Sequence, residues 1–258
     1  GVEYDLDGPI PGEGAVGLLV VGAVDQQVGA FLLGSVSPDI RIITRGERCD
    51  THFTRLTFQR VGEGVEGLLR LHPELSQADR LTEPTRAFVV GYACHLLADE
   101  LWIVEVYRPF FANRQVVRDL ARGNLMDRAL QMELDRREQG ALGGLETLRP
   151  LLAGADKGVQ VGFIPPDTLC EWRQWVENAL GYGFAWDRLH YMARRASPEG
   201  ETPMEGQLEE MEEMVEEFLA AVPQGLERIY QVVPWERVEA VRERALQEML
   251  KFAREYLR

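Results

Sequence analysis

The sequence predicts an all-α protein with about six to eight helices. Two segments near the C-terminus, Met204–Ala221 and Pro234–Leu257, carry apolar residues at steps of three and four, with charged residues between them. This spacing places the apolar residues on one face of a helix. Residues 114–139 show the same one-sided pattern, and Thr82-Glu-Pro84 has the form of a helix start with a proline in the first turn.

The N-terminal part of the chain is the least regular. Residues 1–14 are rich in glycine, proline and acidic residues, so we expect an irregular arm. Residues 15–34 are apolar and interrupted by glycines, and such a short apolar run fits a strand or a helix. Pro38 restricts Ser37 to extended geometry, so residues 35–40 are predicted to be a loop that ends any preceding helix.

The middle of the chain is predicted to be mainly helical. After a polar loop at 44–50, Thr51 to Leu71 has a helical pattern that its glycines weaken. The helix that starts near Thr82 is expected to end at about Tyr107, because Arg108-Pro109 does not continue it. Residues 168–194 carry aromatic side chains at roughly helical spacing.

A linker is predicted between the main helical part and the C-terminal helices. Ser197-Pro-Glu-Gly200 has the composition of a linker. We therefore expect a main helical unit over residues 1–196 and amphipathic helices over residues 197–258 that pack on it. The oligomeric state stays open, because the C-terminal helices could cover their own core or a partner.

Composition and charge argue against some classes of partner. Of the 258 residues, 45% are apolar and 27% charged, which is ordinary for a globular protein. A net charge of −14 argues against binding to a nucleic-acid backbone, although a bound cation would still allow a phosphate substrate. The apolar run Ala15–Val24 is too short to span a bilayer, so no transmembrane segment is predicted.

Cysteine and histidine are both sparse. Three cysteines give neither a disulfide framework nor a paired-cysteine metal motif. We therefore expect a reducing, cytoplasmic location, or secretion if an upstream signal was removed. The chain has four histidines, so a metal-rich site must also draw on carboxylates.

The sharpest chemical signal is an imidazole and a carboxylate within an apolar segment. His95 and Asp99 lie one helical turn apart, on the same stripe as Phe88, Tyr92 and Trp102. Unpaired polar groups are costly to bury in such a stripe, so a metal ion is a strong candidate for their partner. The HxxxD pattern alone is a weak signal, because it often occurs by chance.

Two further residues complete a possible tetrahedral site. Asp39 follows Pro38 in the predicted loop, and His52 lies near a predicted helix start. With His95 and Asp99 they offer two imidazole nitrogens and two carboxylates, which zinc accepts at about 2.0–2.2 Å. An i, i+4 pair is a common way for one helix to present two ligands to one ion.

Three motifs surround these residues. They are Gly34-Ser-Val-Ser-Pro-Asp-Ile40, Thr51-His-Phe53, and the segment Ala87–Trp102 with His-Leu-Leu-Ala-Asp-Glu-Leu-Trp at its end. In order and spacing they resemble the bacterial zinc-dependent phospholipase C family, over about residues 30–140. The resemblance implies an all-α fold and a cleft with up to three zinc ions that hydrolyses phosphoesters, as in the related single-strand-specific zinc nucleases.

By that resemblance one zinc site is complete, with Asp39, His52, His95 and Asp99 as ligands and the second oxygen of Asp99 bridging to a neighbouring zinc. Another site needs an N-terminal amino group and a histidine, but no histidine precedes His52. The remaining site needs a histidine where this chain has Glu105, and a histidine and a glutamate on the next helix. That helix offers other polar residues instead: Asp119, Asp127, Gln131 and Asp135. A carboxylate-rich variant would favour Mg²⁺ or Mn²⁺ over zinc.

The resemblance also implies chemical roles. Asp39 is the candidate general base as well as a ligand, since a metal ion lowers the pKa of a bound water that attacks phosphorus. Arg41, Arg45 and Arg108 could hold the substrate phosphate through their guanidinium groups.

Two functions follow as hypotheses. The first is a metal-dependent phosphoester hydrolase that acts on a small phosphoester or a phospholipid head group. The second is a family member that has lost catalysis and keeps one structural metal site as a binding or scaffold protein, which the missing histidines favour. An HD-type phosphohydrolase is disfavoured, because the chain has no adjacent His-Asp pair.

Overall fold

The computed structural model describes residues 27–142, 145–194 and 205–258. These residues form helices joined by turns, with no strand among them, so the all-α prediction is confirmed for this part of the chain. The predicted N-terminal arm and the linker at 197–200 lie outside the described residues.

Helix α6, Glu83–Trp102, is the central element. It starts as predicted: Thr82 is the N-cap, its hydroxyl accepts a hydrogen bond from the Thr85 N–H at 3.4 Å, and Pro84 lies in the first turn. The cap satisfies one of the free N–H groups at the helix start, and the proline loses no bond there. Local sequence therefore determines this end of α6.

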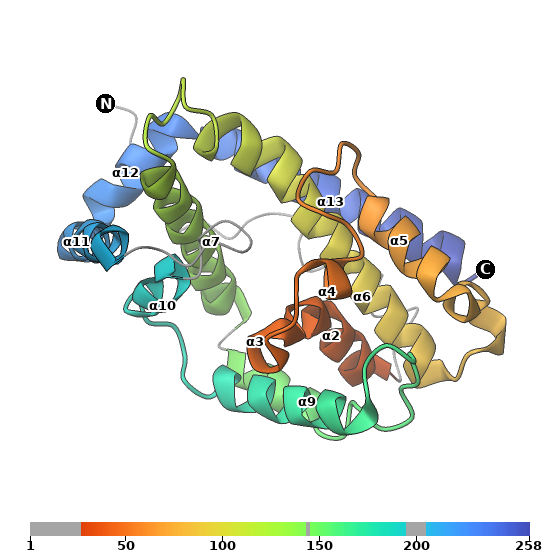
Figure 1. Ribbon diagram of the computed structural model, residues 1–258. Coiled ribbons are helices and arrows are strands. Elements are labelled where there is room, and N and C mark those ends of the chain that lie inside the picture. Colours follow the sequence, from red (N-terminus) through yellow and green to blue (C-terminus); the bar gives the residue numbers. More distant parts are fainter. Residues whose placement is uncertain (1–26, 143–144, 195–204) are drawn as a thin grey trace.

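Other helices cover α6 along much of its length. Helices α2 (Val28–Val36) and α13 (Trp235–Tyr256) pack on it, and Figure 1 shows α13 in blue alongside α6 in yellow. The segment Glu83–Phe111 is long and apolar enough to cross a membrane by composition, yet 67% of its apolar window is buried within the fold. A buried core helix has the same composition, so this segment is only weak evidence for a membrane span.

The far end of α6 differs from the prediction. The helix continues directly into a π-helix, η5 (Ile103–Phe111), with Pro109 inside it. The predicted end near Tyr107 was wrong, because the chain continues there in turns that are wider than those of an α-helix. The N–H of Ala112 donates to the carbonyl of Tyr107, five residues back, at 2.8 Å. A π-turn accommodates a proline ring that would clash with the carbonyl four residues earlier in an α-helix.

Helix α2 settles the described part of residues 15–34 as helix rather than strand. It leads directly into the 3₁₀ turn η2 (Ser37–Ile40). Ser37 has φ −72° and ψ −22°, so the prediction of an extended residue before Pro38 was wrong. The buried Ser37 hydroxyl donates to the Leu33 carbonyl at 2.7 Å, a local bond that offsets the usual preference before proline.

Two glycines let α2 and α6 cross in direct backbone contact. A Cβ atom added at Gly34 would lie 2.1 Å from the carbonyl oxygen of Phe88, and one added at Gly91 would lie 2.0 Å from that of Phe31. Any side chain at either position would push the helices apart. The crossing brings the end of α2 next to the turn of α6 that carries His95.

The predicted helix from Thr51 to Leu71 is only partly correct. Helix α4 (Cys49–His52) is a single turn, and α5 covers Glu63–Leu71. Residues 53–62 between them are not helical, so the prediction was wrong there. The first two residues of α4, Cys49 and Asp50, fall in the segment 44–50 that was predicted to be a loop, so that prediction was wrong for these two residues.

A buried carboxylate fixes α5 against α6. Glu100 of α6 accepts hydrogen bonds from the N–H groups of Gly62 and, at 2.6 Å, Gly64. Gly62 precedes α5 with φ 98°, a left-handed conformation that glycine adopts without strain. The carboxylate thus satisfies free N–H groups at the start of α5 and complements its helix dipole.

Sequence patterns located the remaining helices but not all of their ends. The helix predicted at 114–139 starts at Leu120, because Asp119 caps it by accepting from the Ala121 N–H at 3.0 Å. The segment 168–194 is divided in two, and the C-terminal pair is three helices. The elements not yet given are α3 (Arg41–Thr44), η3 (Pro73–Ser76), η4 (Ala78–Arg80), α7 (Leu120–Leu142), η6 (Leu145–Leu148), α8 (Arg149–Leu152), α9 (Pro166–Leu180), α10 (Arg188–Arg194), α11 (Glu205–Ala220) and α12 (Val222–Val232).

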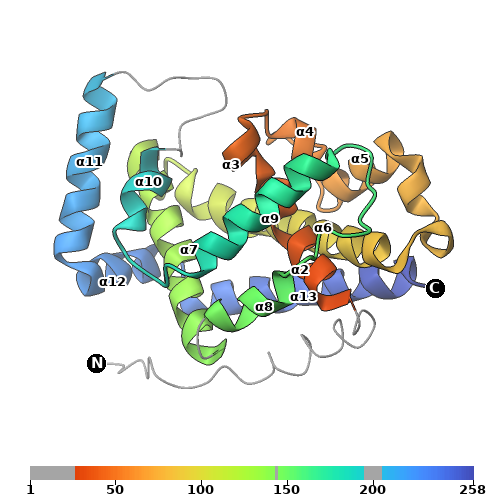
Figure 2. The ribbon, with the colours of Figure 1, turned by 90° about the horizontal axis from the view of Figure 1, so that it is seen from below.

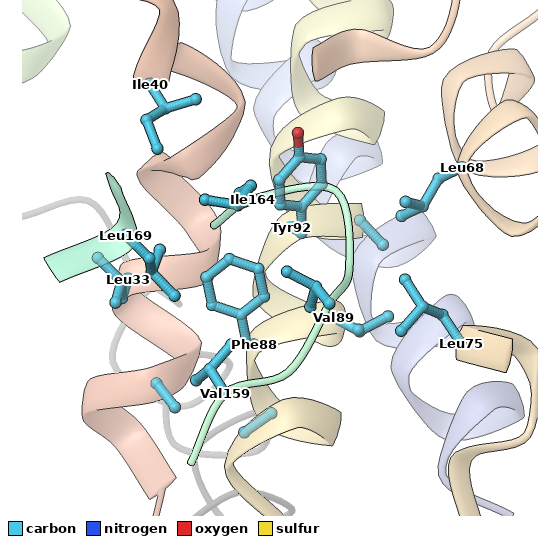
Figure 3. Close-up of a cluster of buried hydrophobic side chains, with 14 of the residues drawn as sticks. Leu33, Ile40, Leu68, Leu75, Phe88, Val89, Tyr92, Val159, Ile164 and Leu169 are labelled. Carbon is cyan, nitrogen blue, oxygen red and sulfur yellow. The ribbon is translucent and has the colours of Figure 1, made fainter. Parts of the chain in front are cut away.

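The core has two main parts. In the first, Phe88 and Tyr92 of α6 pack among side chains of α2 and α9, including Leu33 and Leu169 (Figure 3). The second joins η5 and α7 to α10–α13, and Figures 1 and 2 both show α7, α10, α11 and α12 gathered at one end of the molecule. The C-terminal helices therefore contact the rest of the protein, and a domain boundary at residue 196 stays a prediction.

Glu133 of α7 is a charged group inside the second part of the core. Its side chain is 2% exposed and forms ion pairs with Arg136 and Arg137, each at 2.8 Å. Burial raises its pKa, but the hydrogen bonds from both guanidinium groups outweigh burial, so the pKa lies below its ordinary value of 4.5. These ion pairs therefore stabilise the folded state at pH values above 4.5, and the stabilisation is lost as the pH falls through the lowered pKa of Glu133 in the folded protein.

We expect Glu133→Gln to lower the free energy of unfolding by about 1–3 kcal/mol at neutral pH. The difference between variant and wild type should shrink as acid protonates Glu133 in the wild type. Urea unfolding of both proteins from neutral to acid pH measures it. A difference that stays constant across this range would contradict the assigned charge interaction.

Candidate metal centre

Asp39, His52 and His95 come together at the end of the α2–α6 crossing. Asp39 lies in η2, His52 is the last residue of α4, and His95 lies in the second half of α6. One ligand atom from each lies within 4.8 Å of the other two. The two imidazole centroids are 5.5 Å apart at an interplanar angle of 69°. Three of the four predicted ligands thus converge from three separate segments.

The backbone of α2 orients His95. Its Nδ1 lies 2.8 Å from the carbonyl oxygen of Ser35, so Nδ1 carries the proton and donates it. The lone pair of Nε2 is then available to a metal ion. A carbonyl behind a histidine fixes its tautomer and ring orientation in this way in many metal sites.

His52 has the same tautomer. The Thr51 hydroxyl donates to the Arg48 carbonyl at 3.3 Å, so it accepts from Nδ1 of His52 at 3.1 Å. Nε2 of His52 is buried and has no hydrogen-bond partner among the described residues. Burial, and then the charge of Arg48, lower the pKa of His52, which keeps the imidazole neutral. A neutral, buried nitrogen without a partner is costly unless a ligand such as a metal ion binds it.

The donor set fits zinc. Ligand distances of about 2.0–2.2 Å place the ligand atoms of a tetrahedral zinc about 3.4 Å apart, and atoms within 4.8 Å reach that spacing by small side-chain rotations. Two imidazoles and one carboxylate are also the ligands of some catalytic zinc sites. His52 is buried, whereas Asp39 and His95 are partly accessible, so the centre faces solvent on the Asp39 side.

Tyr92 positions the turn that carries His52. It lies one turn before His95 on α6, and its hydroxyl donates to the carbonyl of Thr51 at 2.5 Å. Burial, and then the charge of Asp39, raise the pKa of Tyr92, so the hydroxyl keeps its proton and remains a donor. The sequence placed Tyr92 on the same stripe as His95, but it gave no sign that Tyr92 reaches α4.

Asp99, the fourth predicted ligand, lies outside this group. Its Oδ2 forms an ion pair with Nη2 of Arg48, the residue that precedes α4. The structure therefore divides the HxxxD pair, with His95 facing His52 and Asp99 facing Arg48. Sequence reasoning missed Arg48, which is 51 positions from Asp99 and lies in a segment that was predicted to be a loop.

Glu105 is also held within the protein. It forms ion pairs with two arginines of α13, Arg237 at 3.0 Å and Arg244. The structure thus places Glu105 in the contact between η5 and α13 and not beside His52 and His95.

The polar residues of α7 are mostly engaged in other interactions. Asp127 is buried, and it accepts hydrogen bonds from Trp102 Nε1 at 2.8 Å and from the Gln131 amide at 2.9 Å. Asp119 caps α7 and Asp135 is exposed. Hydrogen bonds within the protein therefore satisfy the pair Asp127 and Gln131 without a metal ion.

The three arginines considered for phosphate binding differ in position. Arg41 lies close enough to His52 to add to the effect of burial on the pKa of His52. Arg108 donates to the Leu56 carbonyl at 2.6 Å and stacks on Phe58, 4.5 Å from its ring centroid. Arg45 is exposed in the turn after α3.

Comparison with known families agrees with this geometry. Residues 20–102 match the family model described as zinc dependent phospholipase C. The match includes all four predicted ligands of the first zinc site and ends at Trp102, before Glu105. No curated protein and no solved structure matched the chain. The similarity to the zinc-dependent phospholipase C family is therefore established for residues 20–102 of the chain.

Proposed function

We propose that this chain is a metal-dependent phosphoester hydrolase of the phospholipase C type, acting on a small phosphoester or a phospholipid head group. The observation that carries this proposal is the convergence of Asp39, His52 and His95 around a buried imidazole nitrogen without a partner among the described residues. Zinc is the ion that the family and the donor set support. Mg²⁺ or Mn²⁺ would suit a set with more carboxylates.

Bound zinc would polarise the phosphoryl oxygens and lower the pKa of a coordinated water. The residues of the chain then have distinct roles. His52 and His95 carry their protons on Nδ1 and present Nε2 to the ion. Asp39, which is partly accessible to solvent, is placed to take a proton from the attacking water as general base. The bond from water oxygen to phosphorus forms as the ester P–O bond breaks, and the leaving oxygen takes up a proton.

A second candidate function also has an observation in its favour. Two groups that would serve further metal ions, Glu105 and Asp127, bind partners within the protein. A family member that has lost catalysis would keep the Asp39–His52–His95 centre as a structural site and act as a binding or scaffold protein.

Hydrolysis of bis(p-nitrophenyl) phosphate and p-nitrophenyl phosphorylcholine by protein purified without chelator tests the proposal. We expect turnover that EDTA removes and Zn²⁺ restores, and that falls to background in His95→Ala. The matched control is His190→Ala, since His190 pairs with Glu216 of α11, outside the metal centre. Zinc binding without turnover of either ester would favour the scaffold function, and a protein that binds no metal would contradict both.

A further inference from the structure

Two polar side chains at α4, one of them from the residue just before it, face two polar side chains of α6. Arg48 and His52 are four residues apart at α4, and His95 and Asp99 are four residues apart on α6. The pairs face each other: the rings of His52 and His95 lie 5.5 Å apart, and Nη2 of Arg48 binds Oδ2 of Asp99. The ion pair therefore lies one helical turn from the metal centre.

The ion pair between Arg48 and Asp99 is held firmly. The Arg48 side chain is 10% exposed and that of Asp99 is 29% exposed, so solvent screens their attraction only in part. The backbone of Arg48 is fixed too, because its carbonyl accepts from the His52 N–H at 2.8 Å. Nε of Arg48 is already buried without a partner among the described residues, so losing Asp99 would leave a largely buried cation less satisfied still.

We infer that Arg48 holds Asp99 away from the metal, so that the centre has three protein ligands rather than four. This inference rests on the proposed function. A zinc ion with four protein ligands is closed, as in structural sites, whereas a zinc ion with three keeps a position for water or substrate. Arg48 is thus a positioning residue that acts through Asp99 and keeps the centre open for hydrolysis.

Arg48 also affects the charge beside the ion. Its guanidinium cancels the charge of Asp99, so only the Asp39 carboxylate offsets the divalent ion among the residues of the centre. The remaining positive charge attracts a phosphate anion to the free position.

Co²⁺ binding to the metal-free protein tests this inference, because the visible absorption of Co²⁺ reports its ligands. If Asp99 is not a ligand, Arg48→Met/Asp99→Asn, which removes both charges of the ion pair, changes the Co²⁺ dissociation constant by less than about threefold, whereas His95→Ala, which removes a ligand, weakens binding by about 100-fold or more. Inorganic phosphate should shift the wild-type and Asp99→Asn spectra alike, because both keep the free position.

Arg48→Met releases Asp99 and is expected to close the site. Co²⁺ then binds about tenfold more tightly, because a fourth ligand is gained, and inorganic phosphate no longer shifts the spectrum. In Arg48→Met/Asp99→Asn the phosphate response returns. Thermal melts of every metal-free variant separate loss of folding from loss of a ligand.

A weakening of Co²⁺ binding by about tenfold or more in a folded Arg48→Met/Asp99→Asn protein would overturn the inference, because Asp99 would then be a ligand. Hydrolysis could still occur in that case, so the proposed function would stand. A wild type that binds Co²⁺ and responds to phosphate but turns over no ester would contradict the proposed function and support the inference. A wild type that binds no Co²⁺ would overturn both.

Discussion

Gly34→Ala should destabilise the protein by about 3 kcal/mol or more. The added Cβ would lie 2.1 Å from the carbonyl oxygen of Phe88, and that atom belongs to the backbone of the central helix and cannot rotate away. Helices α2 and α6 would have to separate, and contacts across the first part of the core would be lost. Guanidinium unfolding monitored by circular dichroism measures the change.

The matched control for Gly34→Ala is Gly140→Ala. Gly140 also lies in a helix, α7, but a Cβ added there meets no atom within 4 Å. Alanine favours helix more than glycine does, so this variant should be as stable as the wild type or more stable by up to about 1 kcal/mol. Equal destabilisation by the two substitutions would show that the close crossing is not what makes Gly34 necessary.

His52→Ala should weaken zinc binding by about 100-fold or more, because it leaves two of the three converging ligands. The metal-free variant should also be less stable than the metal-free wild type, because the substitution leaves a cavity in place of a buried ring and removes the hydrogen bond from Nδ1 to Thr51. Competition with a chromogenic chelator measures the zinc affinity, and plasma mass spectrometry measures the zinc content after purification.

His190→Ala provides the comparison for His52→Ala, since it removes an imidazole that pairs with Glu216 away from the centre. It should bind zinc as the wild type does. If His52→Ala kept wild-type affinity in a folded protein, His52 would not be a ligand, and its unpartnered nitrogen would need another explanation.

The parts of the fold that depend on local sequence were predictable. Thr82 and Pro84 predicted the start of α6 correctly, because helix capping and the fixed geometry of proline depend on only a few neighbouring residues. The far end of α6 was not predictable, because the helix continues past Pro109 only by changing to π-helical hydrogen bonds. That change involves a whole turn of residues and not a short sequence motif. The need for a glycine at position 34 was not predictable either, because the backbone that it contacts, at Phe88, belongs to another helix.

The same distinction holds for the metal centre. Asp39, His52 and His95 were candidates because their residue types and motifs carry the chemistry, and the structure brings them together. The partner of Asp99 could not be foreseen, because Arg48 is 51 positions away in the sequence and lies in a segment without a clear helical pattern. Contacts between distant segments decide which carboxylate faces the ion and which faces a guanidinium.

The close crossing of α2 and α6 also bears on the size of the ion that the protein selects. The carbonyl of Ser35 on α2 holds His95, and the same chain reaches Asp39 four residues later. The distance between these two ligands therefore depends on how nearly the helices touch, which Gly34 and Gly91 determine without contacting the ion. A larger cation such as Ca²⁺, with oxygen ligands at about 2.3–2.6 Å, would need the helices further apart. We therefore expect the close crossing at Gly34 and Gly91 to favour a small ion such as Zn²⁺ over Ca²⁺ at this centre.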